Sequence, residues 1–124
     1  MKWEKDPVVQ EMMERLAAAE EFAHVRADRV FCVRGEGSKS RAVARIWSLP
    51  RVFQQCLEID AAYIIEVMDK KWDKLSDEEK QKTMIHELLH IPKTFSGALV
   101  PHSCFGKRVV GSRQVDKIWN NLMR

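Results

Sequence analysis

Two histidines and a glutamate, spaced as His-Glu-x-x-His, are the residues of this sequence best suited to metal chemistry. They are His86, Glu87 and His90. Residues four apart lie on the same face of a helix, so the two imidazoles can bind one metal ion together. Glu87 follows the first ligand directly, where its carboxylate can take a proton from a metal-bound water. The motif therefore predicts a zinc site with hydrolytic chemistry.

A zinc site of this kind needs a third protein ligand, because catalytic zinc sites usually have three and leave the fourth position to water. His102 is the first candidate, since it follows His90 by twelve residues and a proline and a glycine between them can turn the chain back. Asp116 and Cys104 are the alternatives, because carboxylates and thiolates also bind zinc. Ligand chemistry and chain reach leave all three open.

The residues around the motif predict that it lies on a helix. Ser76 and Glu79 have the spacing of a capping box, and Pro92 ends the helix just beyond the second histidine. At 100° per residue the apolar side chains fall on one arc of this helix and the histidines on the opposite arc. We therefore expect His86 and His90 to leave the buried stripe and face a separate cleft. The apolar residues of that stripe are Met84, Ile85, Leu88 and Leu89.

Helical spacing of apolar residues predicts further helices on both sides of the motif. The first helix begins at Asp6-Pro7, as N-cap and first helical residue, and runs to about Phe22. A short helix is expected over Arg51–Glu58, after Pro50. Gly111–Met123 forms the last helix, whose buried stripe comprises Val115, Ile118, Trp119 and Leu122.

Runs of β-branched and aromatic residues predict about three strands, over Arg29–Arg34, Ala42–Trp47 and Ala62–Met68. A turn-rich segment joins the first two, so they are expected to pair as a hairpin. Glu66, within the third run, is expected on the solvated face. Residues 91–104 contain two prolines and a glycine and are predicted to form a structured loop. The fold class is therefore α+β with a small sheet.

The composition is that of one ordinary globular domain spanning residues 1–124, with 45% hydrophobic and 31% charged residues. No apolar run reaches membrane-spanning length, and the N-terminus lacks the apolar core of a signal peptide. Cys32, Cys56 and Cys104 are an odd number without paired spacing, which favours free thiols and a cytoplasmic location. The net charge of +3 permits contact with nucleic acid but does not indicate it.

The run from His86 to Gly97, followed by Pro101-His102, resembles the small metallopeptidases of archaea, bacteria and phages. These enzymes belong to the wider zincin group, near the SprT-like and minimal zincin domains. The resemblance is most specific between Tyr63 and His102. It implies a zincin-like fold with a long N-terminal helix, a small twisted sheet, the metal helix packed behind the sheet and a closing C-terminal helix.

The same resemblance implies zinc at His86, His90 and His102, with Glu87 as catalytic base. One zincin branch takes a carboxylate ligand from its last helix, the element on which Asp116 is expected. The chain differs from the metzincin pattern His-Glu-x-x-His-x-x-Gly-x-x-His, because the next glycine follows the second histidine by seven residues rather than three.

Hydrolysis of peptide bonds is the activity that these residues favour, with Glu87 moving a proton from water to the leaving amine. A group that stabilises the oxyanion is also expected, and Tyr63, Arg108 and Arg113 are candidates for it. The edge of the sheet is suited to bind an extended peptide as an added strand. The expected partner is accordingly a peptide or protein, and no membrane partner is expected.

Two other functions stay open. A small metal-dependent endoribonuclease also carries two histidines on a helix and a third downstream, but it has glycine where this chain has Glu87. Basic residues near the C-terminus would then contact phosphates: Lys107, Arg108, Arg113, Lys117 and Arg124. A zinc-stabilised binding module without catalysis would instead fill all four metal positions with protein. The sequence fixes neither the substrate nor the oligomeric state.

Overall fold

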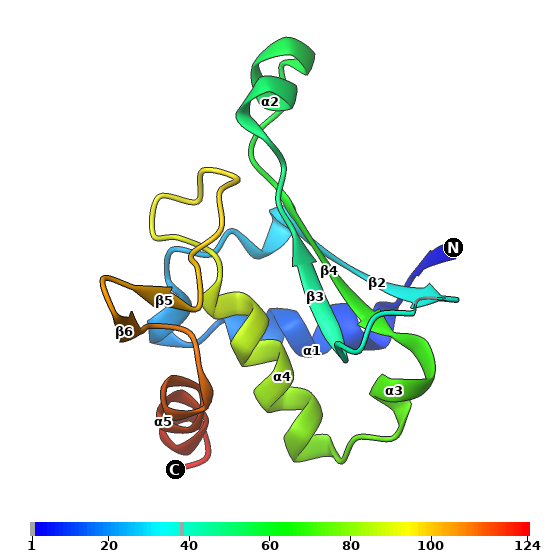
Figure 1. Ribbon diagram of the computed structural model, residues 1–124, viewed down its shortest axis with the longest axis vertical. Coiled ribbons are helices and arrows are strands. Elements are labelled where there is room, and N and C mark those ends of the chain that lie inside the picture. Colours follow the sequence, from blue (N-terminus) through cyan, green and yellow to red (C-terminus); the bar gives the residue numbers. More distant parts are fainter. Residues whose placement is uncertain (1, 38) are drawn as a thin grey trace.

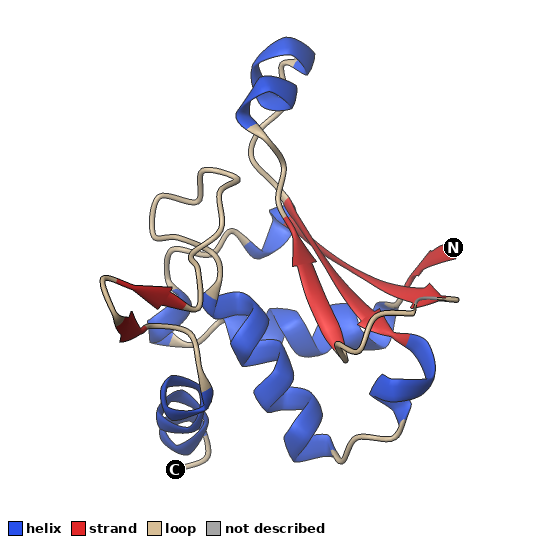
Figure 2. Cartoon of the chain, in the orientation of Figure 1, coloured by secondary structure: helices blue, strands red, loops and turns tan. Residues whose placement is uncertain are grey.

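A mixed sheet with helices packed on one face forms the body of the molecule in this computed structural model (Figures 1 and 2). The structure describes residues 2–37 and 39–124. The strand order is β1-β2-β4-β3; β2 and β4 run parallel, and each outer strand is antiparallel to its neighbour. These strands are β1 (Lys2–Lys5), β2 (Val30–Glu36), β3 (Ala44–Trp47) and β4 (Tyr63–Met68).

Helices α1 and α4 lie against the sheet, and α5 packs on α4 (Figure 1). Helix α2 projects beyond the end of the sheet, and α3 follows β4 directly. A small antiparallel hairpin, β5 (Ser103–Cys104) with β6 (Lys107–Arg108), lies between α4 and α5 in the chain. The helices are α1 (Pro7–Ala17), α2 (Arg51–Leu57), α3 (Asp69–Asp73), α4 (Asp77–Leu89) and α5 (Ser112–Leu122). Among the described residues no helix combines the length and the apolar character needed to cross a bilayer.

The core lies between the sheet and helices α1 and α4. Alternate residues of β4 face it, since successive side chains of a strand point to opposite sides, and Tyr63, Ile65 and Val67 are all buried. Buried side chains of α1 and α4 meet them at helical spacing: Val9, Met12, Met13 and Leu16 from α1, and Met84, Ile85 and Leu88 from α4. The core therefore fixes the helix that carries the His-Glu-x-x-His motif.

The prediction that the first helix runs to about Phe22 is wrong, because α1 ends at Ala17. Ala19 is extended, and Glu20–Phe22 forms a separate 3-10 turn. A continuous helix would place position 22 about 120° from the Leu16 side of the stripe. The break instead turns the Phe22 ring into the core, where it is 1% exposed.

The predicted hairpin of the first two long strands is also wrong. β3 pairs with β4 and not with β2, because β4 lies between them. β4 is the most apolar strand and is buried on both faces over most of its length. This is usual for an inner strand that pairs in parallel with its neighbour. The predicted short helix and the predicted C-terminal helix are confirmed as α2 and α5.

Glu66 on β4 is fully buried, which corrects the expectation of a solvated side chain. Its Oε1 accepts hydrogen bonds from Arg45 Nε and Trp47 Nε1, both at 2.9 Å, from the neighbouring strand β3. Gly35 on β2 makes room for the carboxylate, since a Cβ at that position would overlap with Glu66 Oε2. The acid therefore ties β3 to the central strand.

Removal of the cation from this pair should destabilise the fold, because it leaves a buried carboxylate without its charged partner. We expect Arg45→Met to lower the free energy of unfolding by about 2 kcal/mol, a moderate value because Arg45 is partly exposed. The double variant Arg45→Met/Glu66→Met should recover most of that loss. Urea unfolding of the wild type, both single variants and the double variant measures this. A double variant no more stable than Arg45→Met would contradict the interpretation.

Candidate metal centre

The helix α4 that carries the motif is fixed at both ends. At its N-terminus Ser76 Oγ accepts from the backbone N–H of Glu79, and Glu79 Oε1 accepts from the N–H of Ser76, which completes the predicted capping box. At its C-terminus His90 caps the last turn. His86 is half-buried, but Glu87 and His90 are only 6% and 7% exposed. The expectation that both histidines leave the buried side of the helix therefore holds for His86 and not for His90.

His90 is held by two hydrogen bonds with Val100. The backbone N–H of Val100 donates to the carbonyl of His90 at 2.7 Å, and His90 Nδ1 lies 2.6 Å from the carbonyl of Val100. A carbonyl only accepts, so Nδ1 carries the proton and Nε2 keeps its lone pair. This is the tautomer that a metal-binding histidine needs.

The loop between these two residues is anchored to the core. Tyr63 Oη donates to the carbonyl of Ala98 at 2.7 Å and accepts from the N–H of Gly97 at 2.9 Å. The Gln54 amide donates to the carbonyls of Leu49 and Ser96, at 2.8 and 2.9 Å. These contacts return the chain toward the end of α4, so that the residues after Val100 reach the motif.

His102 lies next to the two histidines of the helix. His86 Nε2 and His102 Nε2 are 3.3 Å apart, and one nitrogen from each of the three imidazoles lies within 4.8 Å of the other two. The His102 carbonyl accepts from the N–H groups of Val109 and Val110, so the β5–β6 hairpin fixes its position. The structure thus brings His86, His90 and His102 together.

The alternative ligands do not join this group. Asp116 borders the same hollow as His86 but pairs with Lys82 at 3.1 Å, and Cys104 is an exposed free thiol. His24, at the end of the first helical region, lies 3.1 Å through Nε2 from the carbonyl of Ile91 and so supports the end of α4. Within residues 2–37 and 39–124, no further His, Cys, Asp or Glu joins the three histidines.

Burial sets the protonation of the site. Desolvation, with the neighbouring His90, His102 and Arg108, lowers the pKa of His86 to about 4. Desolvation also lowers the pKa of His90, although its bond to Val100 opposes the shift. Burial raises the pKa of Glu87 from 4.5 to about 7. No cation of the described chain pairs with the Glu87 carboxylate, which leaves it able to exchange a proton near neutral pH.

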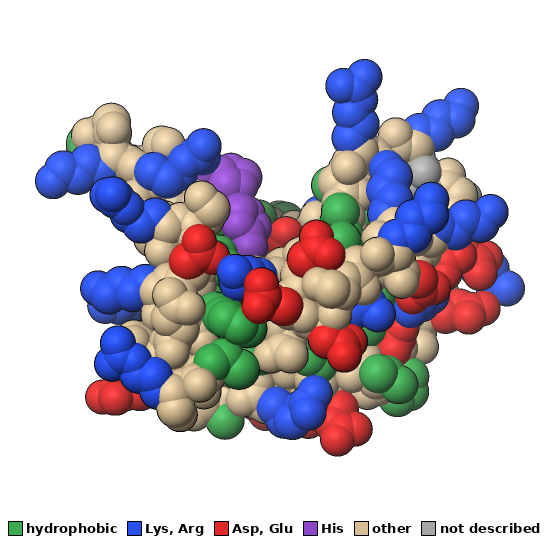
Figure 3. Space-filling view, turned by 90° about the horizontal axis from the view of Figure 1, so that it is seen from below, with side chains coloured by type: hydrophobic (Ala, Val, Ile, Leu, Met, Phe, Trp, Pro, Cys, Tyr) green, Lys and Arg blue, Asp and Glu red, His purple; other side chains and the backbone are tan. Residues whose placement is uncertain are grey.

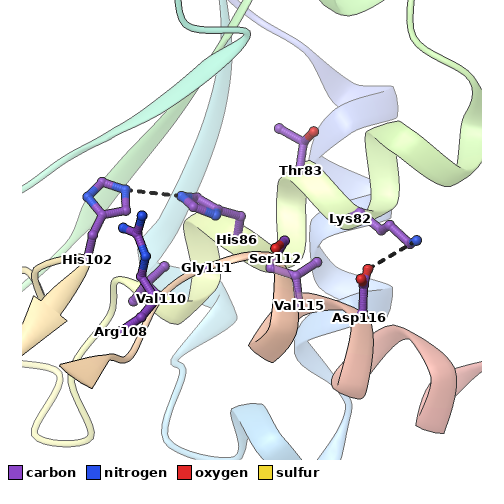
Figure 4. Close-up of a pocket in the computed structure, with 10 residues that line it drawn as sticks. All are labelled: Lys82, Thr83, His86, His102, Arg108, Val110, Gly111, Ser112, Val115 and Asp116. Atoms are coloured by element: carbon purple, nitrogen blue, oxygen red, sulfur yellow. Dashed lines mark hydrogen bonds and ion pairs between the residues drawn. The ribbon is translucent and has the colours of Figure 1, made fainter.

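His86 and His102 open onto a hollow between α4, the β5–β6 hairpin and the start of α5 (Figure 4). The surface view shows histidine side chains in a notch beside a lobe rich in Lys and Arg (Figure 3). Arg108 is directed toward the space between His86 and His102 (Figure 4). Of the three candidates for the oxyanion, Tyr63 is occupied in anchoring the loop, and Arg113 lies in an adjoining hollow.

The three imidazoles fit a metal ion in number and chemistry, and the His86–His102 pair fits it in spacing as well. A tetrahedral zinc ion with ligand distances of about 2.1 Å places its ligand atoms about 3.4 Å apart, close to the 3.3 Å between the Nε2 atoms of His86 and His102. Burial keeps His86 and His90 unprotonated, which metal binding requires. Three protein donors with no fourth in the described chain are typical of catalytic rather than structural zinc sites.

An α+β scaffold that brings three histidines together, two of them on the helix that also carries the buried Glu87, defines a candidate metal-dependent hydrolase. The comparison of the whole sequence gives the same class: residues 1–124 match the family described as "Putative phage metallopeptidase", and the chain belongs to this family. No curated protein and no solved structure gives a significant match.

Gly97 tests whether the anchored loop positions His102. Its φ is +92°, and a Cβ there would overlap with Gln54 Nε2 and the carbonyl of Leu49. Gly97→Ala should therefore displace the loop and weaken zinc binding about tenfold or more. Gly37 is the matched control, because it has φ +75° and open space around it and lies outside the loop and the hairpin that hold His102. Zinc titration with a competing chelator compares the two variants; equal affinities would contradict the role given to the loop.

The raised pKa of Glu87 predicts a pH-dependent gain in stability when this carboxylate is removed. The folded protein favours the protonated carboxyl group of Glu87. The free energy of unfolding is therefore highest below the ordinary pKa of 4.5, and this contribution is lost as the pH rises through about 7. Metal-free Glu87→Gln should match the wild type near pH 4.5 and exceed it by about 2 kcal/mol at pH 8. Chemical unfolding of both proteins in chelator, across this range, measures the difference. A pH-independent difference would contradict the burial argument.

Proposed function

We propose that this protein is a zinc-dependent peptidase that hydrolyses peptide bonds, with Glu87 as general base. The observation that carries the proposal is the meeting of three imidazole donors, two of them on the helix that also carries Glu87, a buried carboxylate without a paired cation. Membership of the metallopeptidase family supports a peptide or protein as substrate. We further propose that the fold is zincin-like, with α4 as the active-site helix.

His86, His90 and His102 would hold the zinc ion. When bound, zinc supplies a Lewis acid for the scissile carbonyl and lowers the pKa of water toward neutrality. The His90–Val100 bond orients one imidazole and raises its basicity as a ligand. Two of the ligands come from a rigid helix and the third from an anchored hairpin, so the protein itself presets the spacing of its donors.

Its place in the motif and its proton affinity support Glu87 as the general base. It lies next to His86 in the chain and is almost completely buried. A carboxyl group with a pKa of about 7 is divided between its two protonation states at neutral pH. It can accept a proton from water and return it to the leaving amine without a large free-energy cost in either direction. Binding of a divalent cation nearby favours its ionised form.

The sheet edge at β3 would hold the substrate. β3 is an outer strand of the sheet, so one side of its backbone is free for an added strand. The residues of β3 pack on α4, which carries the motif. An extended peptide along this edge would therefore lie close to the helix that carries the motif.

The alternatives receive less support from the residues of the site. Glu87 beside the first histidine differs from the glycine of the endoribonuclease pattern. A non-catalytic zinc module would fill a fourth position with protein, and the described chain offers three donors at this point. For this reason the zinc-loaded protein is also incubated with RNA as a second substrate.

Glu87→Gln should retain zinc and lose peptide cleavage. Removal of a general base costs about 10²–10⁴-fold in rate, whereas the three donors are unchanged. The assay is mass spectrometry of a diverse peptide library and of casein after incubation with zinc-loaded protein, and Glu11→Gln, an exposed glutamate of α1, is the control. Chelation should abolish cleavage and zinc should restore it.

The metal content of further variants completes this test. His102→Ala should lose zinc, and Asp116→Asn should keep it. Equal cleavage by the wild type and Glu87→Gln would remove Glu87 from the mechanism. Degradation of RNA with no cleavage of any peptide would replace the peptidase by the nuclease. Stoichiometric zinc with neither activity would favour the binding module.

A further inference from the structure

Arg108 is the basic side chain that faces the histidines most directly. It belongs to β6 and borders the same hollow as His86 and His102, with its guanidinium directed toward the space between them (Figure 4). Its charge is close enough to lower the pKa of His86. Arg108 therefore lies where a substrate bound over the histidines would pass.

The local backbone holds Arg108 in this position. The Arg108 carbonyl accepts a hydrogen bond from Gln114 Nε2 at 2.7 Å, which ties β6 to the first turn of α5. The aliphatic part of the side chain lies flat on Gly111, where an added Cβ would approach its Cγ to 2.8 Å. Arg108 is also the β-sheet partner of Ser103, the residue after His102. One hairpin thus positions both a proposed ligand and this cation.

The positive charge of Arg108 is not neutralised within the described chain. Lys82, the other basic residue at the hollow, pairs with Asp116 at 3.1 Å and with Glu78 at 3.5 Å. Arg108 has no carboxylate partner among the described residues. Lys107 and Arg113 border an adjoining hollow together with Arg108, and they add to the positive potential on this side. A negatively charged ligand can therefore supply the counter-charge that Arg108 lacks within the described chain.

We propose that Arg108 binds a carboxylate group of the peptide substrate close to the bond that is cleaved, so that the substrates are peptides that present a carboxylate at this place. The inference depends on the proposed peptidase function and names its substrate class. The planar guanidinium donates two parallel hydrogen bonds to a carboxylate, which gives selectivity for position as well as charge. Arg108 is exposed to solvent, which suits a permanent substrate charge better than a transient oxyanion, because oxyanion stabilisation works best where water is excluded.

Two sources supply a carboxylate at this place: an Asp or Glu side chain of the substrate, or its C-terminal carboxylate. The first describes an endopeptidase with acidic specificity and the second an enzyme that trims C-termini. Both share the same bidentate contact with Arg108. Matched peptides that differ in one group at a time separate the two sources.

The test measures binding of fluorescent peptides to zinc-loaded Glu87→Gln protein, so that binding is read without turnover. One peptide pair differs by Asp against Asn in the central position, and a second pair by a free against an amidated C-terminus. We expect the protein to bind the carboxylate form of one pair at least tenfold more tightly. Adding Arg108→Gln should remove that ratio while the affinity for the amide form stays unchanged, and Arg108→Lys should keep part of it.

Arg113→Gln in the same background is the matched control, because Arg113 lies in the adjoining hollow and does not border the histidines. It should leave the carboxylate preference in place. Zinc content is measured for each variant. Three outcomes would overturn the proposal: no carboxylate preference, an equal loss of affinity for both members of a pair on Arg108→Gln, or tighter binding of an RNA oligonucleotide that depends on Arg108 in place of the peptides.

The same experiment separates failure of this inference from failure of the proposed function. An Arg108-dependent carboxylate preference in a protein whose wild type cleaves no peptide would sustain the binding site and reject the peptidase. A second result is that the wild type cleaves the acid and amide forms at the same rate, and that Arg108→Gln leaves the ratio of these rates unchanged. This result would sustain the peptidase and reject Arg108 as its specificity residue.

Discussion

The reciprocal pair of hydrogen bonds between His90 and Val100 is the interaction on which the candidate metal centre depends. It closes a ten-residue loop at the end of α4, and it fixes the tautomer of a proposed ligand in the same contact. Without it, His102 would belong to a free connection whose ordering costs conformational entropy at each binding event. With it, the third imidazole is held beside the other two by the protein itself.

The site is coupled to the core through Tyr63. The ring of Tyr63 is buried in the sheet and packs edge-on against Phe95, with ring centroids 5.0 Å apart. Its hydroxyl bonds twice to the loop, at Gly97 and Ala98. Phe95 takes a positive φ of 47°, which is unfavourable for such a residue and is held by this packing. Packing free energy from the core thus stabilises a strained loop that the metal centre requires.

Burial sets the protonation states of the site and also costs free energy of folding. The same loss of water that keeps His86 and His90 neutral raises the pKa of Glu87. In the absence of a metal ion these groups are desolvated without full compensation, so the site does not contribute to stability as an apolar core would. Such an arrangement is typical of functional sites, where perturbed protonation is maintained at the expense of stability.

The sequence predicts the elements whose signals are local. The capping box at Ser76, the Asp6-Pro7 start of α1 and the short helix after Pro50 all depend on neighbouring residues, and all are present. His102 was the first candidate for the third donor, because turn residues lie between it and the motif, but Asp116 and Cys104 stayed open until the structure brought His102 to the helix. Its hairpin was missed, because the Phe105-Gly106 turn has positive φ at both residues and phenylalanine is unusual there.

What the sequence did not predict depends on partners distant in the chain. β1 was missed because its exposed residues carry no apolar alternation, and charged residues are common on such an edge strand. The pairing of β3 with β4 is decided by which strand is buried on both faces. Glu66 has the sequence environment of a solvated residue, and only the approach of Arg45 and Trp47 from β3, with the space at Gly35, makes its burial possible.

Helix α2 shows that an element outside the core can still serve the site. It has no buried residue, and its apolar side chains Val52, Phe53 and Leu57 are exposed, so core packing does not account for its position. Gln54 is its one half-buried side chain, and the amide of Gln54 joins Leu49, before the helix, to Ser96 in the metal-site loop. The same amide occupies the space that a side chain at Gly97 would need. Helix α2 is therefore hydrogen-bonded to the loop that positions His102. The folding of this helix and the geometry of the candidate metal centre are linked through the single amide group of Gln54.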